Sequence, residues 1–280
     1  PTAAGGKMGV ASGVVTVVGT VPTALKTVTV DGYSAIGSGM TNGDATALET
    51  VNLSNGGNFA VAAAAETFNL NLKAVGTATA VATLDLNNAA TKTLNINSDG
   101  GNTVALDLAG AGSTLNLNVT GTGMLNASAV GTDLNNVTTV KVSGTAGLNL
   151  GSTVERTDVT SVDTTGTTGD VTIAIKGASS YAGGAGKDNV TITDAGTAIA
   201  KSINLGAGDD TLTLNGTIVT PTVDLKGGDG TKDTLSMTAA NAVALSANGT
   251  FANKFDGFEV LKLDDKAMAT GTVNLADMDN

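Results

Sequence analysis

The sequence predicts an all-β protein folded as a right-handed parallel β-solenoid, in which each coil adds one rung to a stack of strands. Three observations predict this fold. Glycine–aspartate turns recur at a fixed interval in the C-terminal half, and short apolar–polar–apolar triplets recur along the chain. Large rings are scarce, since aromatic residues make up 2% of the 280 residues. A core of Val, Leu and Ile in short strands fits a narrow solenoid better than a thick globule.

The first two regions of the chain differ in periodicity. Residues 1–45 are the less regular, and we expect a β-rich edge segment belonging to a longer chain. Residues 46–180 carry the triplets, which predict a β-solenoid without the glycine–aspartate turns. Short helices are expected at 60–66 and 239–245. The triplets are Val51–Leu53, Leu70–Leu72, Leu84–Leu86, Leu94–Ile96, Leu106–Leu108, Leu115–Leu117, Val140–Val142, Leu148–Leu150 and Val171–Ile173.

Residues 181–245 contain the three glycine–aspartate turns. They read GGAGKD at 183–188, LGAGDD at 205–210 and GGDGTKD at 227–233, and an apolar–polar–apolar run follows each. Gly184, Gly206 and Gly228 lie 22 residues apart in each step. If one coil has this length, the turns stack on one edge of the solenoid, about 4.8 Å apart.

Such a stack has the ligands that calcium requires. Calcium takes six to eight oxygens, carboxylate or carbonyl, and glycine lets the backbone curl so that carbonyls point inward. We therefore expect two Ca2+ ions, one between 183–188 and 206–210 and one between 206–210 and 227–233. The opposite edge, near 194–196 and 216–221, has fewer carboxylates, and no full site is expected there. The predicted metal-binding residues are Gly184, Gly186, Asp188, Gly206, Gly208, Asp209, Asp210, Gly228, Asp229, Gly230 and Asp233.

The three motifs differ in quality. The first fits the GGxGxDxUx nonapeptide at every defined position, where U is a large apolar residue. Leu205 replaces the first glycine of the second motif. Lys232 adds one residue to the third and could displace Asp233. The alternative is a set of ordinary glycine-rich β-turns, in which aspartate is also common.

Composition excludes several functions. The net charge of −11 comes mainly from aspartate, 21 of the 25 acidic residues, so nucleic acid is not an expected partner. Without histidine or cysteine, Ser-His, Cys-His, zinc and iron chemistry lack their residues. Each aspartate cluster has a calcium-turn explanation, and Arg156 is the one arginine available to a polysaccharide-cleaving groove. We expect no enzyme and no membrane span.

Residues 246–280 are expected to cap or connect the solenoid. Phe251, Phe255 and Phe258 fall within eight residues and predict a plug for the open end. An exposed partner-binding patch is the alternative.

The three turns resemble the RTX calcium-binding β-roll. The longer pattern, including 140–150 and 255–261, is similar to the calcium-dependent S-layer proteins that Gram-negative bacteria export by type I secretion. This resemblance implies an extracellular structural subunit that self-assembles into a two-dimensional lattice on the cell surface. It also implies attachment to outer-membrane lipopolysaccharide through a domain outside this chain. The alternative is an RTX-type secreted adhesin, or the calcium-folding module of an exported hydrolase.

Overall fold

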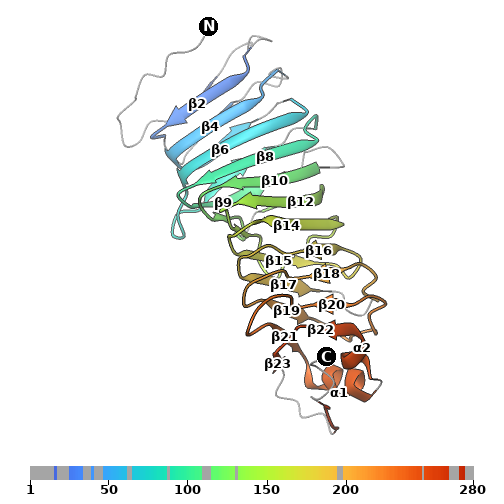
Figure 1. Cartoon of the computed structure of the whole chain (residues 1–280). Coiled ribbons are helices and arrows are strands. Elements are labelled where there is room, and N and C mark those ends of the chain that lie inside the picture. Colours follow the sequence, from blue (N-terminus) through green and yellow to red (C-terminus); the bar gives the residue numbers. More distant parts are fainter. Residues whose placement is uncertain are drawn as a thin grey trace. The chain divides into compact units, whose positions relative to one another are not determined.

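The computed structural model describes residues 16–17, 25–33, 39–40, 47–61, 65–86, 89–108, 115–129, 132–193, 198–247, 249–264 and 271–274. The chain divides into a first unit, residues 1–150, and a second unit, residues 151–280. Each unit is built from parallel strands in two sheets, and Figure 1 shows these strands stacked rung upon rung. The predicted parallel β-solenoid is therefore confirmed. Residues 194–196, expected on the opposite edge, lie outside the described residues.

In the first unit, even-numbered strands form one sheet in the order β2-β4-β6-β8-β10-β12, and odd-numbered strands form the other from β1 to β13. Neighbouring strands within each of these sheets pair in parallel. The strands are β1 (Thr16–Val17), β2 (Thr27–Asp31), β3 (Gly39–Met40), β4 (Thr50–Gly56), β5 (Phe59–Val61), β6 (Thr67–Val75), β7 (Ala82–Asp85), β8 (Thr93–Asp99), β9 (Asn102–Asp107), β10 (Leu115–Gly121), β11 (Leu125–Asn126), β12 (Val137–Gly144) and β13 (Leu148–Asn149).

Alternation along each strand decides which side chains enter the core. In β8, Leu94 and Ile96 are buried, while Asn95 between them is half-buried on the outer face. The outer amides bond from rung to rung: the Asn95 amide donates to Asn69 at 2.9 Å and accepts from Asn118 at 2.8 Å. These contacts tie together β6, β8 and β10 with neutral side chains.

The helix expected at 60–66 is wrong in its first residues. Phe59–Val61 form β5, and the side chains of Phe59 and Val61 are buried. Ala60 pairs with Gly39 and Asp85 of the neighbouring strands. Burial of alternate side chains thus overrides the helical preference of the alanine run. Residues 62–64 lie outside the described residues.

In the second unit, the sheets run β14-β16-β18-β20-β22 and β15-β17-β19-β21-β23, again with parallel pairing. The glycine–aspartate turns connect a strand of the first sheet to one of the second. The strands are β14 (Ser161–Thr167), β15 (Val171–Ile175), β16 (Ser180–Ala182), β17 (Asp188–Ile192), β18 (Ile203–Asn204), β19 (Thr211–Leu214), β20 (Leu225–Lys226), β21 (Thr234–Met237), β22 (Phe255–Asp256) and β23 (Val260–Leu263).

Two helices, α1 (Ala239–Ala247) and α2 (Thr250–Lys254), lie between β21 and β22. The helix expected at 239–245 is confirmed. Phe255 and Phe258 are buried with their ring centroids 6.4 Å apart, so these two rings do not form an exposed patch, and the plug stays a prediction. Among the described residues, neither helix is long and apolar enough to cross a membrane.

Candidate functional site

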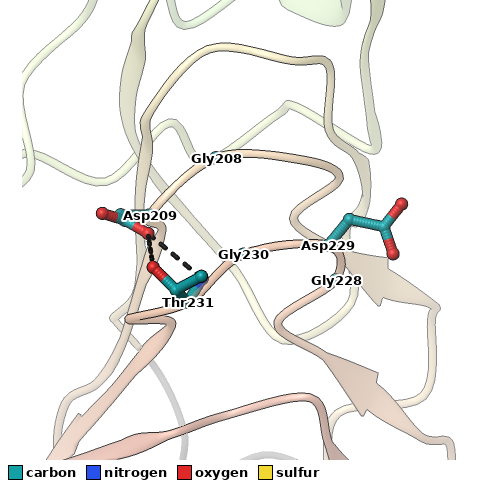
Figure 2. A pocket seen from close by; sticks show the side chains of 6 residues that line it. All are labelled: Gly208, Asp209, Gly228, Asp229, Gly230 and Thr231. Atoms are coloured by element: carbon teal, nitrogen blue, oxygen red, sulfur yellow. Dashed lines mark hydrogen bonds between the residues drawn. The ribbon is translucent and has the colours of Figure 1, made fainter.

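The three glycine turns stack directly on one another, as the 22-residue spacing predicts. The Ala207 N–H donates to the Gly184 carbonyl at 2.7 Å, and the Asp229 N–H donates to the Gly206 carbonyl at 2.7 Å. The Gly208 N–H donates back to the Asp229 carbonyl at 2.9 Å. Figure 2 shows the second and third turns one above the other. The turns therefore bring six glycines of the predicted site together in one column.

Glycine is required in this column because successive backbones lie too close for a side chain. A Cβ on Gly230 would lie 2.2 Å from the Gly208 carbonyl oxygen and 2.7 Å from Oδ2 of Asp233. Gly208 also has a φ of +135°, which L side chains rarely adopt. The missing side chains leave backbone carbonyls and carboxylates facing each other across the turns.

Acidic side chains form a second column beside the glycines. Oδ1 of Asp188 accepts the Val171 N–H at 3.2 Å, and Oδ1 of Asp210 accepts the Asp188 N–H at 2.7 Å. In the next two rungs, Oδ1 of Asp233 accepts the Asp210 N–H at 2.8 Å, and Oε2 of Glu259 accepts the Asp233 N–H at 2.7 Å. One oxygen of each acid thus links its own rung to the preceding one. We call these four residues the carboxylate ladder.

The second carboxylate oxygens differ between rungs. Oδ2 of Asp210 and Oδ2 of Asp233 are buried and have no hydrogen-bond partner among the described residues. Burial raises the pKa of Asp210 to about 7, and it also raises the pKa of Asp233. Two buried acceptors without a donor or cation are costly for a folded protein. They belong to two aspartates that the sequence predicted as calcium ligands, and the other oxygen of each bonds to the preceding rung.

Asp188 has a different environment. Its Oδ2 accepts a hydrogen bond from the Tyr181 hydroxyl at 2.8 Å, and Thr164 Oγ1 lies 3.5 Å away. All three side chains are buried. Burial raises the pKa of Asp188 to about 6 and the pKa of Tyr181 well above its usual value. Both oxygens of this carboxylate therefore have donors without a metal.

Asp209 and Asp229 point to opposite sides of the turns (Figure 2). Oδ1 of Asp209 accepts hydrogen bonds from the backbone N–H and the hydroxyl of Thr231, at 3.2 and 3.3 Å. Both aspartates line the pocket of Figure 2, and Asp229 also lines a second pocket with Lys226 and Asp256. Both aspartates are exposed, so the structure does not bring their side chains to the buried carboxylates of Asp188, Asp210 and Asp233.

The two departures from the nonapeptide pattern, at Leu205 and Lys232, do not change the stacking of the turns. Leu205, in place of a glycine, buries its side chain in the core. Lys232 is exposed, and Asp233 keeps the same contact to the preceding rung as Asp210 does. The expected displacement of Asp233 is therefore wrong, because the extra residue is accommodated at the surface before the strand begins.

Two residues of the site are not evident from the sequence alone. Glu259 continues the carboxylate ladder. The feature of the sequence that could have identified it is a carboxylate 26 residues after Asp233, directly preceded by Gly257-Phe258. The Tyr181 hydroxyl donates a hydrogen bond to Asp188. The feature of the sequence that could have identified it is a polar ring seven residues before the aspartate of the first motif.

The described residues contain no cluster of three or more His, Cys, Asp or Glu side chains suited to a metal ion. An ion in these turns would depend on backbone carbonyls together with one carboxylate from each rung, a donor set that hard cations accept. No protein-family model, curated protein or solved structure matches this chain.

Proposed function

We propose that the turns at 183–188, 206–210 and 227–233 bind calcium and that the ions stabilise the second unit. The observation that carries this proposal is the pair of buried carboxylate oxygens, Asp210 Oδ2 and Asp233 Oδ2, without partners among the described residues. Asp210 would hold one ion with the first two turns, and Asp233 would hold the other with the last two. A bound ion would supply the positive charge that these oxygens lack and would cross-link neighbouring rungs.

Oxygen-only coordination supports calcium over other common metals. The chain has no histidine or cysteine, the ligands that zinc and iron prefer. Magnesium requires a near-ideal octahedron and retains several waters, whereas stacked glycine turns offer backbone carbonyls from both sides. The adaptable geometry of calcium suits such a set better.

At the level of the cell, we propose an extracellular structural subunit of a calcium-dependent S-layer. The support is the solenoid of repeated rungs, the resemblance of the three turns to the RTX β-roll, and a composition without the histidine or cysteine that many catalytic sites use. A chain that folds fully only with calcium would remain incomplete in a calcium-poor cytoplasm and complete its fold after export. Its main partner would be further copies of itself, with lipopolysaccharide bound through a domain outside this chain.

Calorimetric titration of the metal-free chain tests the binding step, with two ions per chain as the expected result. Loss of one ion in Asp210→Asn and of one in Asp233→Asn would assign the two sites. Asp209→Asn is the matched control, because its exposed carboxylate lies beside Asp210 but outside the ladder. Fewer than two ions, or equal effects of all three substitutions, would contradict the assignment.

Electron microscopy tests the assembly step separately. Calcium-treated protein on a lipopolysaccharide-containing surface should form sheets with a regular lattice, and chelator-treated protein should not. Isolated monomers with bound calcium would refute the S-layer proposal while leaving calcium binding intact, and would favour the adhesin or folding-module alternative.

A further inference from the structure

The carboxylate ladder begins with a rung in which hydroxyl groups face the second carboxylate oxygen, the nearer of them from Tyr181 and the more distant from Thr164. Asp188, Asp210 and Asp233 are buried alike, and each accepts the backbone N–H of the preceding rung. At Asp188 the remaining oxygen accepts the Tyr181 phenol, whereas at the other two it has no partner among the described residues. The phenol therefore occupies the side of Asp188 that corresponds to the proposed ion positions.

Strand register explains why only the first rung has this phenol. Tyr181 of β16 pairs with Ile203 of β18, which pairs with Leu225 of β20. Both partners are buried aliphatic residues that cannot donate a hydrogen bond. The same inward position thus carries a donor in one rung and none in the next two.

The turn at 183–188 nevertheless has the same close backbone packing as the turns after it. A Cβ on Gly184 would lie 2.3 Å from the Thr164 carbonyl oxygen and 2.4 Å from that of Thr167. On Gly206 it would lie 2.3 Å from the Gly184 carbonyl oxygen. Carbonyls from the preceding rung therefore face the first turn as they face the second.

We infer that the Tyr181 hydroxyl replaces a cation at Asp188, so that this rung is complete without metal and the calcium-dependent rungs begin at Asp210. This inference rests on the proposed calcium binding. It identifies Tyr181 as the residue that sets where calcium dependence starts in the second unit. Its consequence is that β15 and β17 form a metal-independent base, on which the rungs containing β19 and β21 assemble when calcium is present.

Hydrogen exchange with mass spectrometry on the full chain tests this inference. In the wild type, chelation should leave β15 protected and should lower the protection of β19 and β21. In Tyr181→Phe, chelation should also lower the protection of β15, by about tenfold or more, because a hydrogen bond to a buried charge is lost. Added calcium should restore it, since the opened carboxylate can then take an ion.

Tyr33→Phe is the matched control. Its hydroxyl is also largely buried, but it donates to the Gly57 carbonyl at 2.9 Å, far from any residue of the carboxylate ladder in sequence. This substitution should change exchange in the first unit equally with and without calcium, and should leave β15 unaffected.

The remaining outcomes separate the two proposals. If chelation of the wild type lowers the exchange protection of β15, β19 and β21 together, the role of Tyr181 is overturned and calcium binding still stands. If β15 loses exchange protection in Tyr181→Phe and calcium does not restore it, the hydroxyl has a packing role only. The role of Tyr181 is then also overturned, and calcium binding still stands. No response of any strand to calcium would overturn the proposed function, and this inference with it.

Discussion

The two units are built on the same parallel scaffold but join their rungs through different polar groups. In the first unit, Asn69, Asn95 and Asn118 bond to one another on the outer face of the sheet, and both donors and acceptors come from the protein. In the second unit, the corresponding rung-to-rung contacts lie in the turns and use buried carboxylates. Amides are neutral and complement one another, whereas carboxylates only accept. The asparagine row of the first unit is thus satisfied by protein groups, whereas the buried carboxylates of the second unit are where we propose that a cation binds.

The largest expected effect is that of calcium removal. A ligand at about 1,000 times its Kd stabilises the folded state by about 4 kcal/mol per site. Chelation should therefore lower the melting temperature of the second unit strongly, while the first unit melts unchanged. Calorimetry combined with hydrogen exchange can follow the two units in one sample. If chelation lowers the melting temperatures of both units equally, the two units do not differ in their dependence on calcium.

Neutralising a ladder carboxylate should have opposite effects with and without calcium. With calcium, Asp210→Asn should lose one ion and about 4 kcal/mol of stability. In chelator, the same substitution should stabilise the second unit by about 1–2 kcal/mol, because a buried charge without a partner is removed. Urea unfolding under both conditions measures the two values, with Asp209→Asn as the control. A change of the same sign in both conditions would argue against a cation beside Asp210.

Adding a methyl group inside the turn column should have an intermediate effect. Gly230→Ala places a Cβ 2.2 Å from the Gly208 carbonyl oxygen, and such overpacking costs about 1–3 kcal/mol. Gly216→Ala is the control in the same unit, since its Cβ would meet no atom within 4 Å, although its φ of +84° still disfavours a side chain. Calcium affinity should fall in Gly230→Ala alone. Similar losses of calcium affinity in both variants would show that close packing in the column of glycine turns is not needed for calcium binding.

The smallest effect is expected in the asparagine rows. Asn95→Ala breaks two amide contacts at half-buried positions and should cost the first unit about 1 kcal/mol. Calcium should not alter this cost. A double-mutant cycle with Asn118→Ala, followed by urea unfolding, isolates the direct contact. A coupling energy of zero would show that the row does not stabilise the rungs.

Local patterns predicted most of the scaffold. Alternation placed Leu94 and Ile96 in the core correctly, because strand periodicity needs no information from distant residues. The same rule could have separated Asp210 from Asp209, since neighbouring side chains of an extended chain face opposite sides. The helix expected at 60–66 is wrong at residues 60 and 61, because a short alanine run carries too little information to outweigh burial in a sheet.

Contacts that depend on register could not be predicted from spacing. Tyr181 meets Asp188 only because β16 and β17 belong to different sheets that face each other across the core. Glu259 joins the carboxylate ladder after 26 residues, whereas Asp210 follows Asp188 after 22. The segment containing α1 and α2 lengthens this coil, so a search at a fixed interval misses the last acid.

That longer coil keeps its pairing on both sides of the helices. Leu225 still pairs with Phe255 across 30 residues, and Leu235 still pairs with Leu261. One flank of this coil therefore accommodates extra sequence without disturbing the rungs on either side. This gives the architecture a route for acquiring new surface features: whole segments can be added at a coil's flank while the stacked framework stays in phase.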